Sequence, residues 1–331
     1  MALDRIEIFD SLASDALLKY GMEQTCEARL LQISENITYV VENKESQTKE
    51  GVMRISRPGY HTLEELHSEL LWQKEIKNYT PLIVADPIIG KNGSYVQQIS
   101  SFMSSPYACV MYEFLEGNAP DENDELKIVK QFMDLGETTA YLHRQAKMWN
   151  EAWRLKRFTW SYDTMIGDNA RWGSWKAAVD LTPEVTQMLQ RASEVIKKHL
   201  DAYGSSKEKF GLIHADLRLA NLLIEDDQIK VIDFDDCGFG WFMHDLASAV
   251  SFIEASPIAP ELIDAWIEGY SRVERLTPED IAEVDTFVMQ RRLQLLAWIS
   301  SHFDSDPVRD LSIGFTEGTA TLAEKYLGKF S

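Results

Sequence analysis

The sequence lacks the features that mark several classes of protein. Its three cysteines, Cys26, Cys109 and Cys237, are far apart, so they form neither a zinc-ligand pattern nor a disulfide framework, and we expect buried reduced thiols. No apolar run is long enough to cross a bilayer, and the opening MALDRIEIFD has no basic segment followed by an apolar core. We therefore expect a cytoplasmic protein without a membrane partner.

Basic residues are also scarce. The chain has 33 Lys and Arg against 53 Asp and Glu, a formal net charge of −20. Because phosphate binding needs clustered cations, we expect no nucleic-acid partner. A cationic small molecule suits this charge, although a solvated acidic surface explains it equally well. The sequence makes no prediction of oligomeric state.

The length and composition predict a globular chain with two lobes. The chain has 331 residues, more than one compact core usually contains, with 45% hydrophobic and 26% charged residues. No internal repeat or low-complexity tract is present. The helix-breaking segment GNAP follows the strand-like YACVMYEFLE, so we predict an N-terminal lobe over 1–116 and a C-terminal lobe over 117–331.

The first third of the chain is predicted to be mainly β. CEARLLQISENITYVVENKES and KEGVMRISRP have alternating β-suited runs and predict an antiparallel meander, while SYVQQIS and YACVMYEFLEG are also strand-like. One helix interrupts them in HTLEELHSELLWQKEI, where Leu63, Leu66 and Leu70 share a face and Thr62 with Glu65 forms a capping box.

Helices dominate the rest of the chain. We expect long helices in ELKIVKQFMDLGETTAYLHRQA and TPEVTQMLQRASEVIKKHL, two more within 260–302, and a last one over 315–327. Short buried strands interrupt the helical pattern in GLIHADL, NLLIED and IKVIDFDD.

The segment LIHADLRLANLLIEDDQIKVIDFDD places polar side chains beside two apolar runs. His214 and Asp216 are separated by one residue, Asn221 follows five residues after Asp216, and Asp233 ends the run IKVID. A tight loop and a strand end can bring Asp216, Asn221 and Asp233 to one point. Carboxylates gathered at low dielectric repel each other unless a cation lies among them, and Mg²⁺ prefers hard oxygen ligands. The sequence thus predicts a metal-nucleotide site.

This pattern resembles the catalytic and metal loops of the kinase fold. IHADLRLANLLI resembles the H-[GN]-D-x-x-x-x-N-x-[LI] element of the aminoglycoside phosphotransferase and choline kinase family, with Ala215 at the position of its small or amide residue. VIDFDD followed by HDLA resembles its I-D-[FWL]-x…D-[LI]-A element. The likeness extends over nearly the whole chain and implies an α+β, two-lobed protein-kinase-like fold.

The resemblance implies an ATP- and Mg²⁺-dependent transfer of the γ-phosphoryl group to a small-molecule hydroxyl. Asp216 would be the catalytic base, Arg218 would neutralise charge on the transferring group, and Asn221 and Asp233 would hold Mg²⁺. His214 would brace the loop, and Asp245 of HDLA would tie it down.

The N-terminal lobe would bind the nucleotide. In VMRI, Arg54 stands where the family has a lysine, and Glu69 is its expected ion-pair partner. Three groups of residues complete the expected nucleotide contacts: the hairpin residues Ser34, Glu35 and Asn36, the hinge residues Glu113 and Leu115, and the ring contacts Val52, Met111 and Leu223.

Each of these assignments has a simpler alternative. Arg54 with Glu69 is in isolation an ordinary salt bridge, and Arg218 is equally well a surface arginine. Trp160, Trp172 and Trp175 could line a substrate cleft, but core packing is expected for at least two of them. Asp235, Asp236 and Glu254 could bind an amine, with solvation the expectation for any one of them.

The physiological acceptor stays open. Members of the family use aminoglycosides, choline-like amino alcohols and homoserine-like amino acids. SENITYVV, RISRPGY and DFDD also resemble the bacterial stress-response kinase branch, so a protein Ser/Thr kinase is an alternative. A nucleotide-binding regulator without turnover is another, for which Arg54 is the best support.

Overall fold

The computed structural model describes residues 2–33, 36–100, 106–121, 124, 126–226, 228–303 and 306–330. The chain forms two compact units, each built from three segments. Unit 1 comprises Met1–Asn118, Trp153–Lys156 and Leu223–Ile232, and unit 2 comprises the rest: Ala119–Ala152, Arg157–Leu222 and Asp233–Ser331. The predicted division of the chain at residue 116 took each lobe as one continuous segment and stays a prediction.

Unit 1 contains a five-stranded antiparallel sheet with the order β1-β2-β3-β6-β5. Its strands are β1 (Cys26–Ile33), β2 (Asn36–Asn43), β3 (Lys49–Ser56), β5 (Val96–Ile99) and β6 (Tyr107–Glu113). The predicted meander is confirmed by the neighbouring positions of β1, β2 and β3. Alternating residues point to opposite faces of this sheet, so the sheet presents side chains to two different cores.

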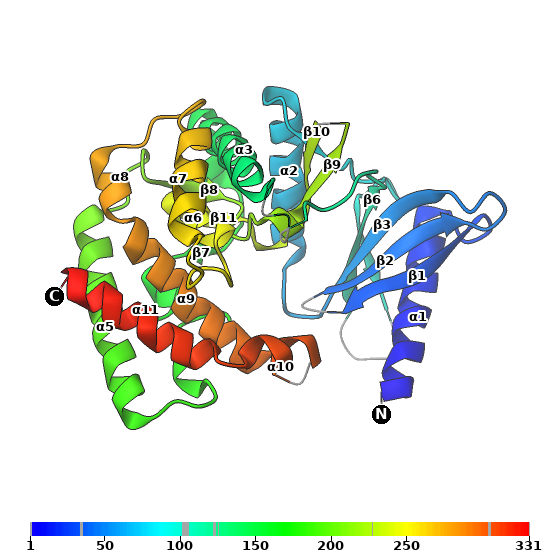
Figure 1. The fold of residues 1–331 in the computed structure, drawn as a ribbon. Helices are drawn as coiled ribbons and strands as arrows, with labels where there is room; N and C mark the ends of the chain where they lie inside the picture. Colours follow the sequence, from blue (N-terminus) through cyan, green and yellow to red (C-terminus); the bar gives the residue numbers. More distant parts are fainter. Residues whose placement is uncertain are drawn as a thin grey trace. The chain divides into compact units, whose positions relative to one another are not determined.

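Two helices cover the two faces of this sheet (Figure 1). On one face, α1 (Ala2–Tyr20) packs Leu12 and Ala16 against a core that includes Met53 and Met111. On the other, α2 (Leu63–Tyr79) packs against Val110 and its neighbours through buried residues that include Leu66 and Leu70. The predicted capping box of α2 is present, whereas Leu63 is 37% exposed and does not share the buried face.

The sequence-based reading missed α1. The available signal was the helical spacing of the buried positions Leu12, Ala13, Ala16, Leu17 and Tyr20. The Tyr20 hydroxyl donates to the carbonyls of Tyr95 and Cys109 at 2.6 and 3.1 Å and accepts from the N–H of Met111 at 3.2 Å. These bonds attach the end of α1 to β6 and to the residue that precedes β5.

A small three-stranded sheet also belongs to unit 1, in the order β4-β10-β9. Its strands are β4 (Ile83–Val84), β9 (Leu222–Glu225) and β10 (Gln228–Val231). β10 runs parallel to β4, with Lys230 opposite Ile83. The two strands β9 and β10 lie in the sequence between Asn221 and Asp233, so the candidate metal ligands flank a segment of unit 1.

Unit 2 is mostly helical around a second three-stranded sheet, in the order β7-β11-β8. Its strands are β7 (Thr159–Trp160), β8 (Phe210–Ile213) and β11 (Gly238–Trp241). Its helices are α3 (Ile128–Met148), α4 (Tyr162–Met165), α5 (Pro183–Tyr203), α6 (Met243–Ala249), α7 (Ala259–Tyr270), α8 (Pro278–Ala282), α9 (Val284–Ser301), α10 (Asp306–Ser312) and α11 (Phe315–Phe330). Short 3-10 turns lie at 175–177, 219–221 and 234–236, and another at 152–154 belongs mostly to unit 1. All the predicted long helices are present.

Two contacts within unit 2 position the site. The helix α9 is buried along most of its length, because α6, α5 and α11 pack around it. The helices α3 and α7 approach backbone to backbone, where a Cβ on Gly136 would lie 2.0 Å from the Trp266 carbonyl oxygen and one on Gly269 would lie 1.8 Å from that of Met133. Only glycine allows this approach.

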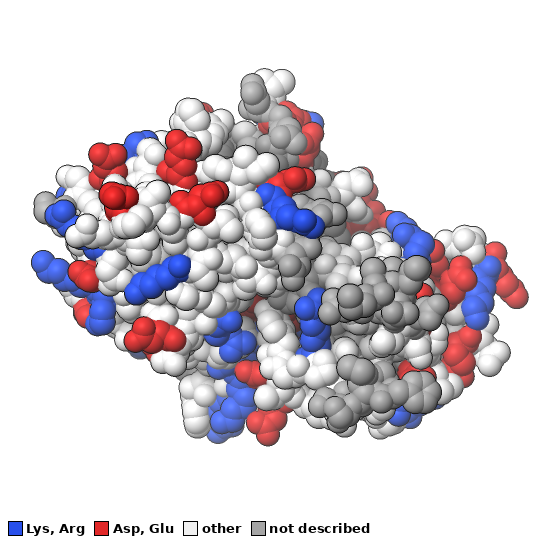
Figure 2. Space-filling view, turned by 90° about the horizontal axis from the view of Figure 1, so that it is seen from below, with Lys and Arg blue, Asp and Glu red and all other residues white. Residues whose placement is uncertain are grey.

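Within the described ranges, none of the helices combines the length and the apolarity that a bilayer crossing needs. On the face drawn in Figure 2, acidic and basic side chains are interspersed among uncharged residues. This pattern is typical of a solvated surface.

Candidate active site

The loop that follows β8 is fixed by a buried carboxylate. Asp245 on α6 is fully buried, and its two oxygens accept from the backbone N–H groups of His214 at 3.1 Å and Ala215 at 2.7 Å. The expected anchoring role of Asp245 is thus confirmed. The His214 ring packs against Phe234 at a centroid distance of 4.7 Å, which braces the loop from the other end of the segment.

The same carboxylate connects the loop to two helices. His143 on α3 contacts Asp245 Oδ2 through Nε2 and the Tyr270 hydroxyl through Nδ1, each at 3.0 Å. Burial lowers the pKa of His143, although the neighbouring Asp245 opposes this shift. A neutral imidazole satisfies both contacts when Nε2–H donates to the carboxylate and Nδ1 accepts from Tyr270. The buried network therefore sets the loop position without an additional charge.

Ala215 adopts a left-handed backbone conformation with φ 68°. This conformation costs an L-residue other than glycine or asparagine roughly 1 kcal/mol or more. Its N–H donates to Asp245, and its carbonyl accepts from the Ser248 hydroxyl at 2.9 Å, so surrounding bonds hold the strained peptide. The strain explains why a glycine or an asparagine suits this position of the motif.

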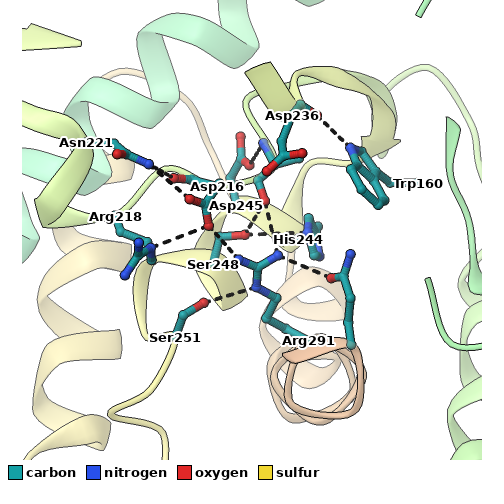
Figure 3. A network of polar contacts seen from close by, with 12 residues as sticks. Trp160, Asp216, Arg218, Asn221, Asp236, His244, Asp245, Ser248, Ser251 and Arg291 are labelled. Carbon is teal, nitrogen blue, oxygen red and sulfur yellow. Dashed lines mark hydrogen bonds and ion pairs between the residues drawn. The ribbon is translucent and has the colours of Figure 1, made fainter. Parts of the chain in front are cut away.

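Asp216 lies at the centre of a polar network (Figure 3). Its Oδ1 is 2.5 Å from Nη2 of Arg291 and 3.4 Å from Nε of Arg218, and its Oδ2 accepts from Nδ2 of Asn221 at 3.0 Å. The side chain is 20% exposed, so it remains accessible. Burial alone would raise the pKa of Asp216, but the charges of Arg218 and Arg291 hold it below its ordinary value. The carboxylate is ionised at neutral pH.

The sequence-based reading missed Arg291. This residue comes from α9, about 75 positions after Asp216, and its side chain is only 1% exposed. Its Nε donates to the Ser251 hydroxyl at 3.0 Å and its Nη1 to the side-chain oxygen of Gln294 at 3.2 Å, while the guanidinium lies 5.0 Å from the ring centroid of Trp172. One signal was available: TFVMQRRLQLLAWIS is apolar on nearly every side, so an arginine within it has no solvated face to occupy.

The candidate metal ligands have suitable chemistry. Asn221 is 8% exposed and uses its Nδ2 to donate to the backbone carbonyl and carboxylate of Asp216, whereas its Oδ1 takes no hydrogen bond from the described residues. Asp233 is exposed and left-handed, with φ 63°. Among the described residues, no group of three His, Cys, Asp or Glu side chains is arranged for a metal ion. An amide oxygen and an exposed carboxylate nevertheless fit a cation that keeps several water ligands, such as Mg²⁺.

The predicted ion pair of unit 1 is present. Nη2 of Arg54 lies 2.8 and 2.7 Å from the two carboxylate oxygens of Glu69, and both side chains are buried. Glu69 also accepts from the Tyr112 hydroxyl at 3.0 Å and from Gln73 at 3.4 Å. The pair is therefore part of a buried polar cluster between β3 and α2, and its role in nucleotide binding stays a prediction.

The other expected nucleotide contacts fall into three groups. Ser34 and Glu35 lie outside the described residues, while Asn36 begins β2 and is buried, with its Oδ1 unbonded among the described residues. Glu113 ends β6, and its N–H already donates to the Asp86 carbonyl at 2.8 Å. The contacts of Glu113 and Leu115 with an adenine edge stay a prediction. Both hinge residues and Leu223 belong to unit 1.

Met111 requires a correction. In the register of β3 and β6, Met53 lies opposite Met111 and Val52 lies opposite Tyr112. Because side chains alternate between faces, Met111 points into the fully buried core beneath α1, whereas Val52 and Arg54 occupy the opposite face. Met111 and Val52 therefore cannot enclose one adenine ring, so the predicted contact of Met111 with the ring is wrong.

The tryptophans and acids that were considered as substrate contacts are mostly buried. Trp160, Trp172 and Trp175 are all buried, so core packing is confirmed for them. The expectation of solvation is wrong for Glu254, which is buried and pairs with Arg292 at 2.8 Å, and for Asp235, which is buried too. Asp236 is half-buried, and its carbonyl accepts from the Trp160 indole at 2.7 Å.

Comparison with known proteins identifies the family. The profile of the phosphotransferase enzyme family matches residues 29–284. A solved structure of a microcompartment-associated aminopropanol kinase is 37% identical, with a TM-score of 0.87 over 96% of this chain and 98% of that chain. Amicoumacin kinase of Bacillus subtilis (strain 168) is 22% identical over 90% of this chain and 87% of its own length. A solved amicoumacin kinase complex with AMP-PNP and Ca²⁺ is 19% identical, with a TM-score of 0.76 over 97% of this chain and 96% of that chain, and supports the fold alone.

The chain belongs to the phosphotransferase enzyme family. The predicted α+β kinase-like fold, with a small antiparallel sheet and a mostly helical remainder, is confirmed. The chain is thus a kinase that transfers a phosphoryl group to the hydroxyl of a small molecule.

Proposed function

We propose that the chain transfers the γ-phosphoryl group of ATP to the hydroxyl of a small amino alcohol, with Mg²⁺ as the divalent ion. The observation that carries the proposal is the 37% identity, over 96% of the chain, to a protein described as an aminopropanol kinase. A net charge of −20 favours a cationic acceptor over an anionic one.

In this proposal Asp216 orients the acceptor hydroxyl and takes its proton. The ionised carboxylate, its accessible surface and its fixed position support the role, because a base must lie within hydrogen-bond reach of the proton it removes. Arg218, whose side chain is 26% exposed beside Asp216, neutralises charge on the transferring group.

The nucleotide would be bound by unit 1. Arg54, positioned by Glu69, contacts phosphate, and its permanent charge and planar head suit that role. Val52 and Leu223 enclose the adenine, and the backbones of Glu113 and Leu115 contact its edge. Ser34, Glu35 and Asn36 complete the phosphate contacts. ATP as donor agrees with the cytoplasmic location predicted from the sequence.

Asn221 and Asp233 would hold the Mg²⁺, which would supply positive charge to neutralise the phosphates. Asp233→Ala removes the exposed carboxylate, so we expect the affinity for Mg-ATP to fall at least tenfold while unit 2 stays folded. Calorimetric titration with Mg-ATP measures this. Asp226→Asn, a change at an exposed left-handed turn, serves as the control. Unchanged affinity in Asp233→Ala means that another group holds the metal.

A panel of acceptors tests the proposed substrate class. ADP release is measured with aminopropanol, ethanolamine, choline, homoserine, an aminoglycoside and amicoumacin, and with a generic protein substrate. Isopropylamine lacks the hydroxyl and propanol lacks the amine, so they are the matched controls. We expect the highest kcat/KM with a short amino alcohol. Preferred phosphorylation of protein, or ATP binding without turnover on any acceptor, contradicts the proposal.

A further inference from the structure

We propose that Arg291 is a positioning residue that orients Asp216 and prevents the ammonium group of an amino alcohol from occupying the place of its hydroxyl. The proposal rests on the proposed function and extends it to the way the site distinguishes the two polar ends of one acceptor.

The first step is the rigidity of Arg291. It is buried within α9, and separate nitrogens contact separate partners: Nε the Ser251 hydroxyl, Nη1 the Gln294 side chain and Nη2 Asp216 Oδ1. The guanidinium carbon lies 5.0 Å from the ring centroid of Trp172. These contacts fix the Arg291 side chain in one orientation, in which its guanidinium contacts Oδ1 of Asp216.

The second step is that the two carboxylate oxygens of Asp216 have different partners. Oδ1 is occupied by Arg291, with Arg218 as a second neighbour, whereas Oδ2 contacts the amide of Asn221. Arg291 also reaches the backbone carbonyl of Ala215 at 3.4 Å, so it contacts both the strained peptide and the side chain that follows it. The carboxylate therefore cannot rotate freely, and Oδ2 is the oxygen presented to an acceptor.

The third step concerns charge. An amino alcohol carries a hydroxyl and an ammonium a few ångströms apart, and an uncompensated carboxylate attracts the ammonium more strongly than the neutral hydroxyl. Such binding would be inverted and unproductive. Two arginines beside Asp216 cancel this attraction and repel a third cation, while a hydroxyl still donates to the carboxylate. Arg291 thus makes the site selective for the hydroxyl end.

Arg291→Gln tests the charge. Binding of isopropylamine, which has no hydroxyl, is measured by ligand-observed NMR and as inhibition of turnover. We expect the variant to bind the amine on the order of tenfold more tightly than the unmodified protein, and to lose kcat with little rise in the KM of the acceptor. The additional Asp216→Asn change should abolish the gain. A folded Arg291→Gln protein without tighter amine binding overturns the proposal. NMR binding needs no turnover, so failure of the proposed function is seen separately, in the acceptor panel.

Two further variants separate charge from fold. Arg291→Lys keeps the charge but cannot make all the contacts, so we expect amine binding to stay at its original level and kcat to fall at least tenfold; an unchanged kcat overturns the positioning role even if Arg291→Gln fails to fold. Arg292→Gln is the matched control. Arg292 is the next residue of α9, is buried, and pairs with Glu254 rather than with the loop, so its loss should lower Tm without increasing amine binding.

Discussion

Each unit contains a buried arginine paired with a carboxylate, and the two pairs differ in what they leave open. In unit 1, Glu69 is fully buried and its oxygens are taken by Arg54, Tyr112 and Gln73. In unit 2, the arginine is the more buried partner, while Asp216 keeps 20% of its side chain exposed. In the proposed function, the pair of unit 1 positions its cation, Arg54, and the pair of unit 2 positions its anion, Asp216. The same type of ion pair would then serve two different chemical roles.

The largest expected effect comes from removing the exposed anion. Asp216→Asn keeps the shape of the side chain but not the charge that accepts the hydroxyl proton, so kcat should fall about a thousandfold while ATP affinity is retained. Steady-state kinetics and nucleotide titration measure the two quantities. Asp226→Asn should leave both unchanged. Residual kcat near the original value removes Asp216 from the chemistry.

Removing the buried anion of unit 1 should instead act mainly on stability. Glu69→Ala leaves the Arg54 guanidinium buried without its partner, and we expect a loss of about 3–5 kcal/mol in the free energy of unfolding. Glu42→Ala breaks the pair with Arg29, whose side chain is 57% exposed, and should cost less than about 1 kcal/mol. Denaturant titration compares the two, and equal losses contradict the assigned difference in burial.

Acidification should lower the free energy of unfolding through a buried histidine of unit 2. Burial, aided by the nearby Arg291, lowers the pKa of His244 to about 3, whereas an unfolded histidine has a pKa near 6.5. Below pH 6.5 His244 binds a proton in the unfolded state but stays neutral in the folded state. The free energy of unfolding therefore falls by about 2 kcal/mol between pH 6.5 and pH 5. His143, whose pKa burial also lowers, adds to this loss.

The contribution of His244 can be isolated by mutation. His244→Gln should flatten the pH dependence of the unfolding free energy in this window, while His67→Gln, at an exposed position of α2 in unit 1, should leave it unchanged. Denaturant titrations at several pH values measure the slope. An identical slope in His244→Gln and the unmodified protein contradicts the assignment.

The smallest effect is expected from the strained peptide next to Asp216. Ala215→Gly relieves the left-handed strain but makes the unfolded chain more flexible, so the unfolding free energy should rise by less than about 1 kcal/mol. Ala247→Gly, in the interior of α6, should lower it. Calorimetry gives both Tm values, and a lower Tm in Ala215→Gly argues that the methyl group packs usefully.

Local patterns predicted much of this molecule. The capping box of α2, the strand alternation of unit 1 and the spacing around Asp216 are short-range signals, and each corresponds to what the structure contains. Arg54 and Glu69 were paired because both positions belong to a known framework. The helix α1 was missed, although the spacing of Leu12, Ala16 and Tyr20 is also a local helical signal.

The remaining parts depend on tertiary packing. Arg291 reaches Asp216 only because α9 is buried against α6, and no local pattern specifies that contact. Met111 was assigned to the wrong face because the register of β6 against β3 decides which side chains point toward α1. Glu254 was expected in solvent because its partner Arg292 lies 38 residues away in sequence.

The contact of Gly136 with α7 and of Gly269 with α3 has a consequence for turnover. The same two helices contribute His143 and Tyr270, which together hold Asp245 and through it the N–H groups of His214 and Ala215. The distance between the axes of α3 and α7 therefore influences the position of the loop that carries Asp216. We therefore expect that a single methyl group added at Gly136 or Gly269 would slow turnover by displacing the loop that carries Asp216.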